Sequence, residues 1–204
     1  MIITHTKGRG KKIHLHLDGE YQITTDIDFW AENFIKDGTD IDDDEWQDLC
    51  DKINFKKAVN KCYDLLSRRD HSVKELRTKL LRTVDEQSAD RAIERMLEFG
   101  YLDDEKYAKT LLKHLRDDKK MSKSFIKQEM YKRGISSDII SDLLFAEEFD
   151  NASSVCELIL TKYNRKLQTE GGKDKVIAAL MRKGFSYTDI REAFARIENG
   201  EYEQ

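Results

Sequence analysis

The sequence repeats itself at an interval of fifty residues, and this periodicity constrains the fold more than any other feature. Pairs of apolar residues spaced four apart recur in three copies, each copy fifty residues after the last. The six residues are Leu76 and Leu80, Ile126 and Met130, and Val176 and Leu180. A spacing of four is typical of one face of an α-helix. We therefore predict three related helices, each at the centre of a repeated unit.

Each unit is predicted to contain three helices. The first helices are expected at 55–67, 103–117 and 149–165, and Ser72 with Glu75 forms a capping box that begins a second helix. Ile140 and Ile190 correspond in the third helices, with Ile93 and Leu97 as counterparts of Ile140 and Leu144 in the first unit. The units span residues 55–102, 103–149 and 150–204. Units of this size bury little core alone, so we expect neighbours to pack into an elongated, curved array.

The remaining residues, 1–54, are predicted to form a small β segment followed by short acidic helices. Apolar and polar residues alternate over 13–17 and again over 21–25, with Asp18-Gly19 between them. This is the pattern of a β-hairpin with a type I′ turn, and Ile2 to Thr6 is expected to add a third strand. The chain has no proline, as expected of a helix-rich protein. The fold class is therefore mainly α.

Charge is distributed unevenly along the chain. Residues 1–50 carry 5 basic and 12 acidic residues, a net charge of −7, whereas the rest of the chain carries +3. The acidic residues between Asp37 and Asp51 are expected to begin a helix, because negative charge stabilises a helix N-terminus. The balance does not favour a generic cationic nucleic-acid-binding protein.

Metal, disulfide and membrane functions find little support in the sequence. Cys50, Cys62 and Cys156 are odd in number and widely spaced, so Cys62 and Cys156 are expected to be buried thiols. His14 and His16 share one face of a strand without a third ligand at a suitable spacing. No apolar run approaches the ~18 residues of a membrane span, and the N-terminus lacks a secretory leader pattern. We expect a cytoplasmic protein with no cofactor and no membrane partner.

Three segments of the chain resemble a known family. They are YDLLSRRDHSVKELRTKL at 63–80, MLEFGYLDDEKYA at 96–108 and IKQEMYKRGI at 126–135. Together with the hairpin IHLHLDGEYQI they make the chain similar, over almost its whole length, to the RecX family of bacterial regulators of the RecA recombinase. The chain departs from the family at Val84, where members have a glycine at the end of the second helix.

The resemblance implies a function and a partner. RecX proteins bind the RecA–DNA filament, lodge in its helical groove and suppress ATP hydrolysis, strand exchange and co-protease activity. It therefore implies a non-enzymatic regulator of DNA repair and the SOS response, expected to be a monomer. Its partners would be the RecA filament and, weakly and without sequence preference, DNA.

Basic side chains recur near corresponding positions of the three units and are the candidate contacts for the filament or DNA. Arg82, Lys132 and Arg182 are the clearest such set, fifty residues apart. The complete set of candidates is Arg68, Arg69, Lys74, Arg77, Arg82, Lys123, Lys127, Lys132, Arg133, Lys173, Arg182 and Lys183. A curved array would give these cations an extended surface able to follow a groove.

Three other classes of function remain for comparison. An enzyme is disfavoured, because GRGKK lacks phosphate-loop spacing and no nucleophile, base and acid set is recognisable. A transcription factor would need base-reading residues in its third helices, which are instead acid-rich. A helical-repeat interaction module, or a non-specific DNA-binding protein unrelated to RecA, is separated from the leading hypothesis by the family resemblance alone.

Overall fold

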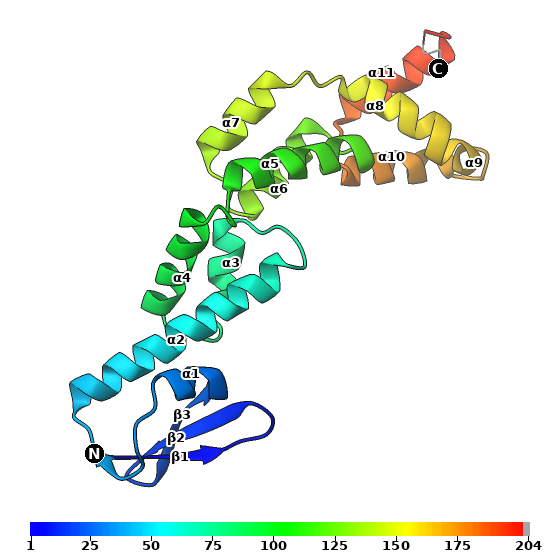
Figure 1. Cartoon of the computed structure of the whole chain (residues 1–204). Coiled ribbons are helices and arrows are strands. Elements are labelled where there is room, and N and C mark those ends of the chain that lie inside the picture. Colours follow the sequence, from blue (N-terminus) through cyan, green and yellow to red (C-terminus); the bar gives the residue numbers. More distant parts are fainter. Residues whose placement is uncertain (202–204) are drawn as a thin grey trace. The chain divides into compact units, whose positions relative to one another are not determined.

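The computed structural model of the chain describes residues 1–201, which divide into two compact units (Figure 1). The first unit contains residues 1–70 and 76–101. The second contains residues 71–75 and the chain from residue 102 on. Residues 202–204, the end of the expected third repeat, lie outside the described residues.

The N-terminal residues form an antiparallel sheet, as predicted. Its strands are β1 (Ile2–Lys7), β2 (Lys12–Leu17), β3 (Glu20–Asp26) and β4 (Thr39–Asp40), in the order β3-β2-β1-β4. Asp18 and Gly19 both have positive φ angles, 49° and 87°, between strands paired through Leu17 and Glu20. This geometry confirms the type I′ hairpin turn. The two-residue strand β4 was not predicted, because it is too short to show any alternation.

Two helices pack with this sheet. Helix α1 (Ile27–Glu32) is followed by α2 (Asp43–Leu66), which Asp42 begins with a capping box to Glu45. The helix expected at 55–67 therefore starts twelve residues earlier, and the boundary at 54/55 falls inside α2. No glycine or proline interrupts 43–66. The helix continues without a break while its packing partners change. Leu49 and Ile53 belong to the core cluster of the sheet and α1, and α2 also packs against α4.

The second and third helices expected of the first repeat are present, with one correction. Helix α3 (Val73–Leu80) and helix α4 (Glu86–Glu98) follow α2, and α4 packs against it. Met96 is fully buried, whereas Leu97, expected to face the core, is 44% exposed. The buried stripe of α4 runs through Ala89, Ile93 and Met96, so Leu97 falls one position outside it.

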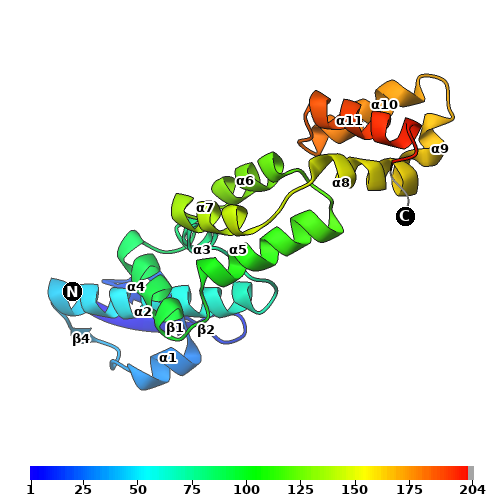
Figure 2. The ribbon, with the colours of Figure 1, turned by 90° about the horizontal axis from the view of Figure 1, so that it is seen from above.

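The second unit contains the helices expected of repeats two and three. They are α5 (Asp104–Lys113) with the wider turn η1 (His114–Asp118), α6 (Lys123–Lys132), α7 (Ser137–Ala146), α8 (Asn151–Leu158) with η2 (Ile159–Tyr163), α9 (Asn164–Leu167), α10 (Gly172–Arg182) and α11 (Tyr187–Glu198). In both repeats the first helix ends in a π-helical turn. Helix α8 packs against α11, and α10 contacts both α9 and α11 (Figure 2).

The periodicity is confirmed at its central residues. All six apolar residues that recur at fifty-residue intervals have no exposed surface. Ile126 and Met130 lie in one core cluster with Ile140 and Leu144, and Val176 and Leu180 lie in the equivalent cluster of the third repeat. The mainly α fold with a small N-terminal sheet is therefore the observed class.

A recurring joint, not anticipated from the sequence, links second helices within the second unit. The Ser72 hydroxyl donates to the carbonyl oxygen of Arg133, and the Ser122 backbone N–H donates to that of Lys183 at 3.1 Å. Each carbonyl is followed by a glycine with positive φ, 83° at Gly134 and 87° at Gly184. In both cases the C-terminal turn of one helix is seated on the N-terminal turn of another.

Candidate nucleic-acid interface

The twelve candidate cations divide between the two units. Four belong to the first unit: Arg68, Arg69, Arg77 and Arg82. Eight belong to the second: Lys74, Lys123, Lys127, Lys132, Arg133, Lys173, Arg182 and Lys183. The candidate cations therefore do not all belong to one compact unit.

Arg82, Lys132 and Arg182 are the most accessible recurring set. Each lies two residues after a fully buried residue of the fifty-residue pattern, and each side chain is exposed. None of the three forms an ion pair within residues 1–201. A cation without a carboxylate partner can neutralise a phosphate without first breaking an internal contact. These positions are therefore chemically suited to backbone contacts.

Two of the candidate arginines are engaged by carboxylates of the first unit. The Arg77 Nε atom lies 2.6 Å from Asp90 Oδ1, and its guanidinium also pairs with Glu86. These hydrogen bonds, to Asp90 first and then Glu86, raise the pKa of Arg77. Arg68 Nη2 lies 2.7 Å from Asp64. Arg77 thus ties α3 to the first two turns of α4, and a phosphate would have to compete with two carboxylates for it.

Arg133 belongs to a network that explains the GYLDDEKYA segment. Its Nη1 atom donates to the Tyr107 hydroxyl at 2.7 Å, and that hydroxyl donates to Glu75 at 3.2 Å. Asp104 accepts the backbone N–H of Val73 at 2.9 Å. Burial disfavours the charge of Arg133, but the hydrogen bonds to Tyr107 and Glu129 raise its pKa. The segment therefore holds the start of α3, and Arg133 has a structural role there.

Lys183 has a comparable place at the second joint. Its ammonium group donates to the carbonyl oxygen of Lys119 and lies 3.9 Å from the sulfur of Met121. Burial lowers the pKa of Lys183, and the nearby charges of Lys162 and Lys119 lower it further. Three lysines thus share one neighbourhood, where an anion would relieve their repulsion.

Three candidate lysines lie over aromatic rings. Lys123 Nζ is 5.1 Å from the centroid of Phe149, and Lys173 Nζ is 4.8 Å from that of Phe194. Lys127 Nζ is 6.0 Å from the ring of Tyr131. Cation–π contacts orient an ammonium group without neutralising its charge. These lysines keep their capacity to attract phosphate.

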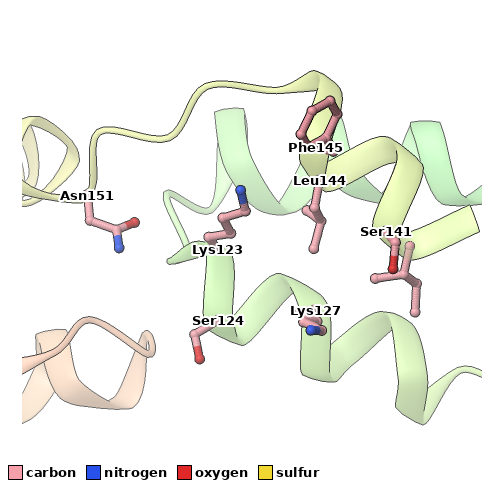
Figure 3. Close-up of a pocket in the computed structure, with 8 residues that line it drawn as sticks. Lys123, Ser124, Lys127, Ser141, Leu144, Phe145 and Asn151 are labelled. Carbon is pink, nitrogen blue, oxygen red and sulfur yellow. The ribbon is translucent and has the colours of Figure 1, made fainter. Parts of the chain in front are cut away.

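A hollow of about 560 Å³ lies between α6, α7 and the start of α8. Lys123 and Asn151 extend into the same opening, Leu144 points toward α6, and Phe145 stands at the rim (Figure 3). The lining residues are Lys123, Ser124, Lys127, Ile140, Ser141, Leu144, Phe145 and Asn151. Their polar groups are two ammonium groups, two hydroxyls and one amide, with no carboxylate.

Sequence reasoning included the two lysines of this hollow but missed Phe145, Ser141 and Asn151. A signal for Phe145 was available. Ile140 and Leu144 define the buried stripe of α7, and Phe145 lies one position beyond it, on the helix face that also carries Ser141 and Asp142. A large ring outside the apolar stripe of a helix is informative, because such rings are usually buried. The contribution of Asn151 depends on the tertiary fold.

The described part of the chain holds neither a metal-binding cluster nor a membrane-spanning helix. No group of three or more His, Cys, Asp or Glu side chains within residues 1–201 is arranged to hold a metal ion. No helix in that range combines the length and apolar character of a membrane-spanning segment. Cys62 and Cys156 are fully buried, as predicted, and burial raises the pKa of Cys62 to about 11.

Two family models match consecutive parts of the chain. The first, described as the first three-helix domain of RecX, matches residues 58–96. The second, the second three-helix domain of RecX, matches residues 103–144. The matched ranges correspond to the first and second repeats.

Comparison with whole proteins also finds similarity to RecX proteins. The chain is 26% identical to the regulatory protein RecX of Streptococcus gordonii, over 97% of this chain and 78% of that protein. It is 29% identical to the regulatory protein RecX of Caldanaerobacter subterraneus subsp. tengcongensis, over 95% of this chain and 98% of that one. A crystal structure of a regulatory protein RecX superposes with a TM-score of 0.58, at 20% identity, over 95% of this chain and 98% of that one.

Proposed function

We propose a function for this chain from the family to which it belongs, the RecX family of regulatory proteins. In this proposal the protein binds the RecA–DNA filament and inhibits its recombinase, ATPase and co-protease activities. It would thereby modulate DNA repair and the SOS response. The observation that carries the proposal is the similarity to RecX proteins over nearly the whole chain.

The arrangement of the exposed cations supports contact with a filament. Each repeat carries one exposed cation at the same position: Arg82, Lys132 and Arg182. A protein with one cation per repeat is suited to a partner that is itself built from repeated subunits. A filament offers one RecA subunit after another along continuous DNA. A protein built from similar units could contact several subunits at once, and such multivalent binding strengthens weak individual contacts.

The experiment is a RecA ATPase assay on single-stranded DNA, together with RecA-stimulated cleavage of a repressor. We expect less than one molecule of this protein per RecA to lower both activities. The protein incubated with ATP and DNA but without RecA is the control, and it should hydrolyse no ATP if the protein is not an enzyme. Unchanged activities at a molar excess, under conditions where RecA forms filaments, would show that the proposed function is wrong.

We further propose that the protein acts as a monomer in the cytoplasm and requires no metal or nucleotide of its own. Its direct affinity for DNA would be weak and independent of sequence, and greater when RecA is present. Metal analysis after purification without chelators tests the first point. A stoichiometric, tightly bound ion would contradict it.

A further inference from the structure

Phe145 is exposed to an unusual degree for an aromatic residue. Its side chain is 92% exposed, whereas the preceding residue, Leu144, is 5% exposed and lies in the core. Phe145 therefore contributes nothing to the packing of α7. Isolated apolar side chains on a surface are common, but this ring stands at the rim of a hollow. A ring with both faces open to solvent is available to stack on another flat group.

The opposite wall of the same hollow is cationic. Lys123 and Lys127 lie one helical turn apart on α6, so their side chains share a face. Neither is in an ion pair within residues 1–201. The hydroxyls of Ser124 and Ser141 and the amide of Asn151 complete the polar lining. The volume of about 560 Å³ lies within the roughly 300–1,000 Å³ typical of ligand-binding hollows.

We infer that this hollow binds a nucleotide unit of single-stranded DNA, with the phosphate at Lys123 and Lys127 and the unpaired base stacked on Phe145. Aromatic stacking combined with a cationic groove is the general mode by which proteins bind single strands without reading sequence. The inference deepens the proposed function, on which it rests, by assigning one of the DNA contacts to a site in the second repeat. It also gives that contact a preference for single strands.

Single-stranded DNA suits this lining better than the alternatives. In a duplex each base is covered on both faces by its neighbours, so Phe145 could not stack and only the lysines would contribute. An acidic peptide would pair with the lysines but would not provide the base that matches the ring, hydroxyls and amide. Of these three occupants, only a single-stranded nucleotide combines a phosphate that matches the lysine wall with an exposed flat base that matches Phe145.

The test measures binding of fluorescein-labelled oligothymidine, and of a duplex of equal length, by fluorescence anisotropy without RecA. We expect the parent to prefer the single strand. Phe145→Ala should weaken single-strand binding about tenfold, leave duplex binding unchanged and abolish the preference. The double variant Lys123→Gln with Lys127→Gln should weaken binding to both and reduce the log–log salt slope on single strands by roughly 1.4.

Two further variants separate stacking from general surface effects. Tyr187→Ala removes another exposed aromatic side chain, 62% exposed, from α11 and should bind like the parent. Phe145→Trp keeps a flat ring, so it should retain affinity, and the introduced indole should lose fluorescence when oligothymidine stacks on it. Circular dichroism melting curves check that every variant is folded.

Specific results would overturn the inference. A folded Phe145→Ala protein that binds single strands like the parent excludes stacking at this ring, and so does an indole whose emission oligothymidine leaves unchanged. If Phe145→Ala keeps DNA binding but loses RecA inhibition, the occupant is a protein. The anisotropy and indole-fluorescence measurements contain no RecA, so they can be interpreted even if the proposed inhibition of RecA is wrong, and the RecA assays can be interpreted even if Phe145 does not stack on DNA.

Discussion

At the residue scale, the Asp150 carboxylate both caps the start of α8 and pairs with a positive charge on α11. It begins α8, accepts the backbone N–H of Ser153 at 2.9 Å, and lies 3.2 Å from the Arg196 guanidinium of α11. The hydrogen bonds from the backbone and hydroxyl of Ser153, followed by that from Arg196, lower the pKa of Asp150 from 3.8 to about 2. The folded state therefore favours the ionised form.

This shift predicts a pH-dependent contribution to stability. A lowered carboxyl pKa stabilises the fold fully above about pH 4, and the effect is lost as the pH falls toward 2. Asp150→Asn should therefore lower the free energy of unfolding by about 1 kcal/mol at pH 7, a value reduced for solvent screening of an exposed group. Urea titrations at pH 7 and pH 2.5 measure it.

The control is Asp142→Asn on the exposed surface of α7, which should have little effect at either pH. If Asp150→Asn costs as much at pH 2.5 as at pH 7, the loss reflects packing or the cap geometry, and the charge argument is wrong.

The thiols give a second prediction at this scale. Burial raises the pKa of Cys50, Cys62 and Cys156, so the reactive thiolate is scarce at all three. Cys62 and Cys156 are also fully buried, whereas Cys50 is partly exposed. In the native protein at pH 8, Ellman's reagent should react slowly with one thiol, and with three after unfolding in guanidinium. Fast reaction of two or more native thiols would contradict the burial.

Sequence reasoning at the residue scale succeeded for buried residues and was weaker for charged ones. Periodicity places a residue on a face of its helix, and so the central core residues and the two buried cysteines were predictable. It does not show which carboxylate from another helix approaches a cation. Arg77 and Arg133 belong to recurring surface positions in the sequence, yet both are engaged by internal partners that only the tertiary fold brings near.

At the scale of the elements, the glycines that follow α6 and α10 do more than end those helices. A Cβ atom at Gly184 would lie 2.5 Å from the Ser122 hydroxyl and 2.6 Å from Phe125 Cβ. One at Gly134 would lie 2.4 Å from Lys74 Cβ. Both glycines also have positive φ, which disfavours other residues. The joint between second helices therefore requires glycine for conformation and for space.

Gly184→Ala should consequently destabilise the second unit by about 2–4 kcal/mol, the sum of backbone strain and a steric clash. Thermal melting followed by circular dichroism provides the measurement. Gly100→Ala is the matched control: Gly100 also follows a helix with a positive φ of 69°, but a Cβ atom there meets nothing within 4 Å. It should cost about 1 kcal/mol. Equal losses in the two variants would mean that the joint leaves room for a methyl group.

The elements themselves were largely predictable, whereas the joints were not. Helix caps and the hairpin turn are local patterns, and the fifty-residue period is a regular spacing, so all three can be recognised in a single sequence. The continuity of α2 through residue 54 was missed, because a change of packing partner inside one helix leaves its period unchanged. The joint depends on a hydroxyl and a carbonyl sixty-one residues apart, Ser72 and Arg133, which no local pattern relates.

At the scale of the whole molecule, net charge limits how the protein can hold DNA. The chain carries −4 overall, with −7 in residues 1–50 and +3 in the remainder. Long-range attraction to DNA is therefore weak, and binding must depend on local cations within about 8 Å of phosphates at physiological salt. The proposed dependence on RecA follows, since contacts with the filament protein would add to a small number of phosphate contacts.

The triple variant Arg82→Ala, Lys132→Ala and Arg182→Ala tests this limit. These side chains are exposed and make no ion pair within residues 1–201, so the fold should survive their loss. On single-stranded DNA each lost phosphate contact reduces the log–log salt slope by about 0.7, so we expect a slope smaller by about 2 together with weaker RecA inhibition.

A second triple variant, Lys7→Ala, Arg9→Ala and Lys12→Ala at the connection between β1 and β2, removes the same charge elsewhere. If net charge alone governed binding, both variants would lose affinity equally. If the recurring positions are contacts, only the first changes the slope and the inhibition, because screening confines the effect of a cation to phosphates near it. A first variant that is folded and inhibits RecA like the parent would show that the recurring cations are simply solvated.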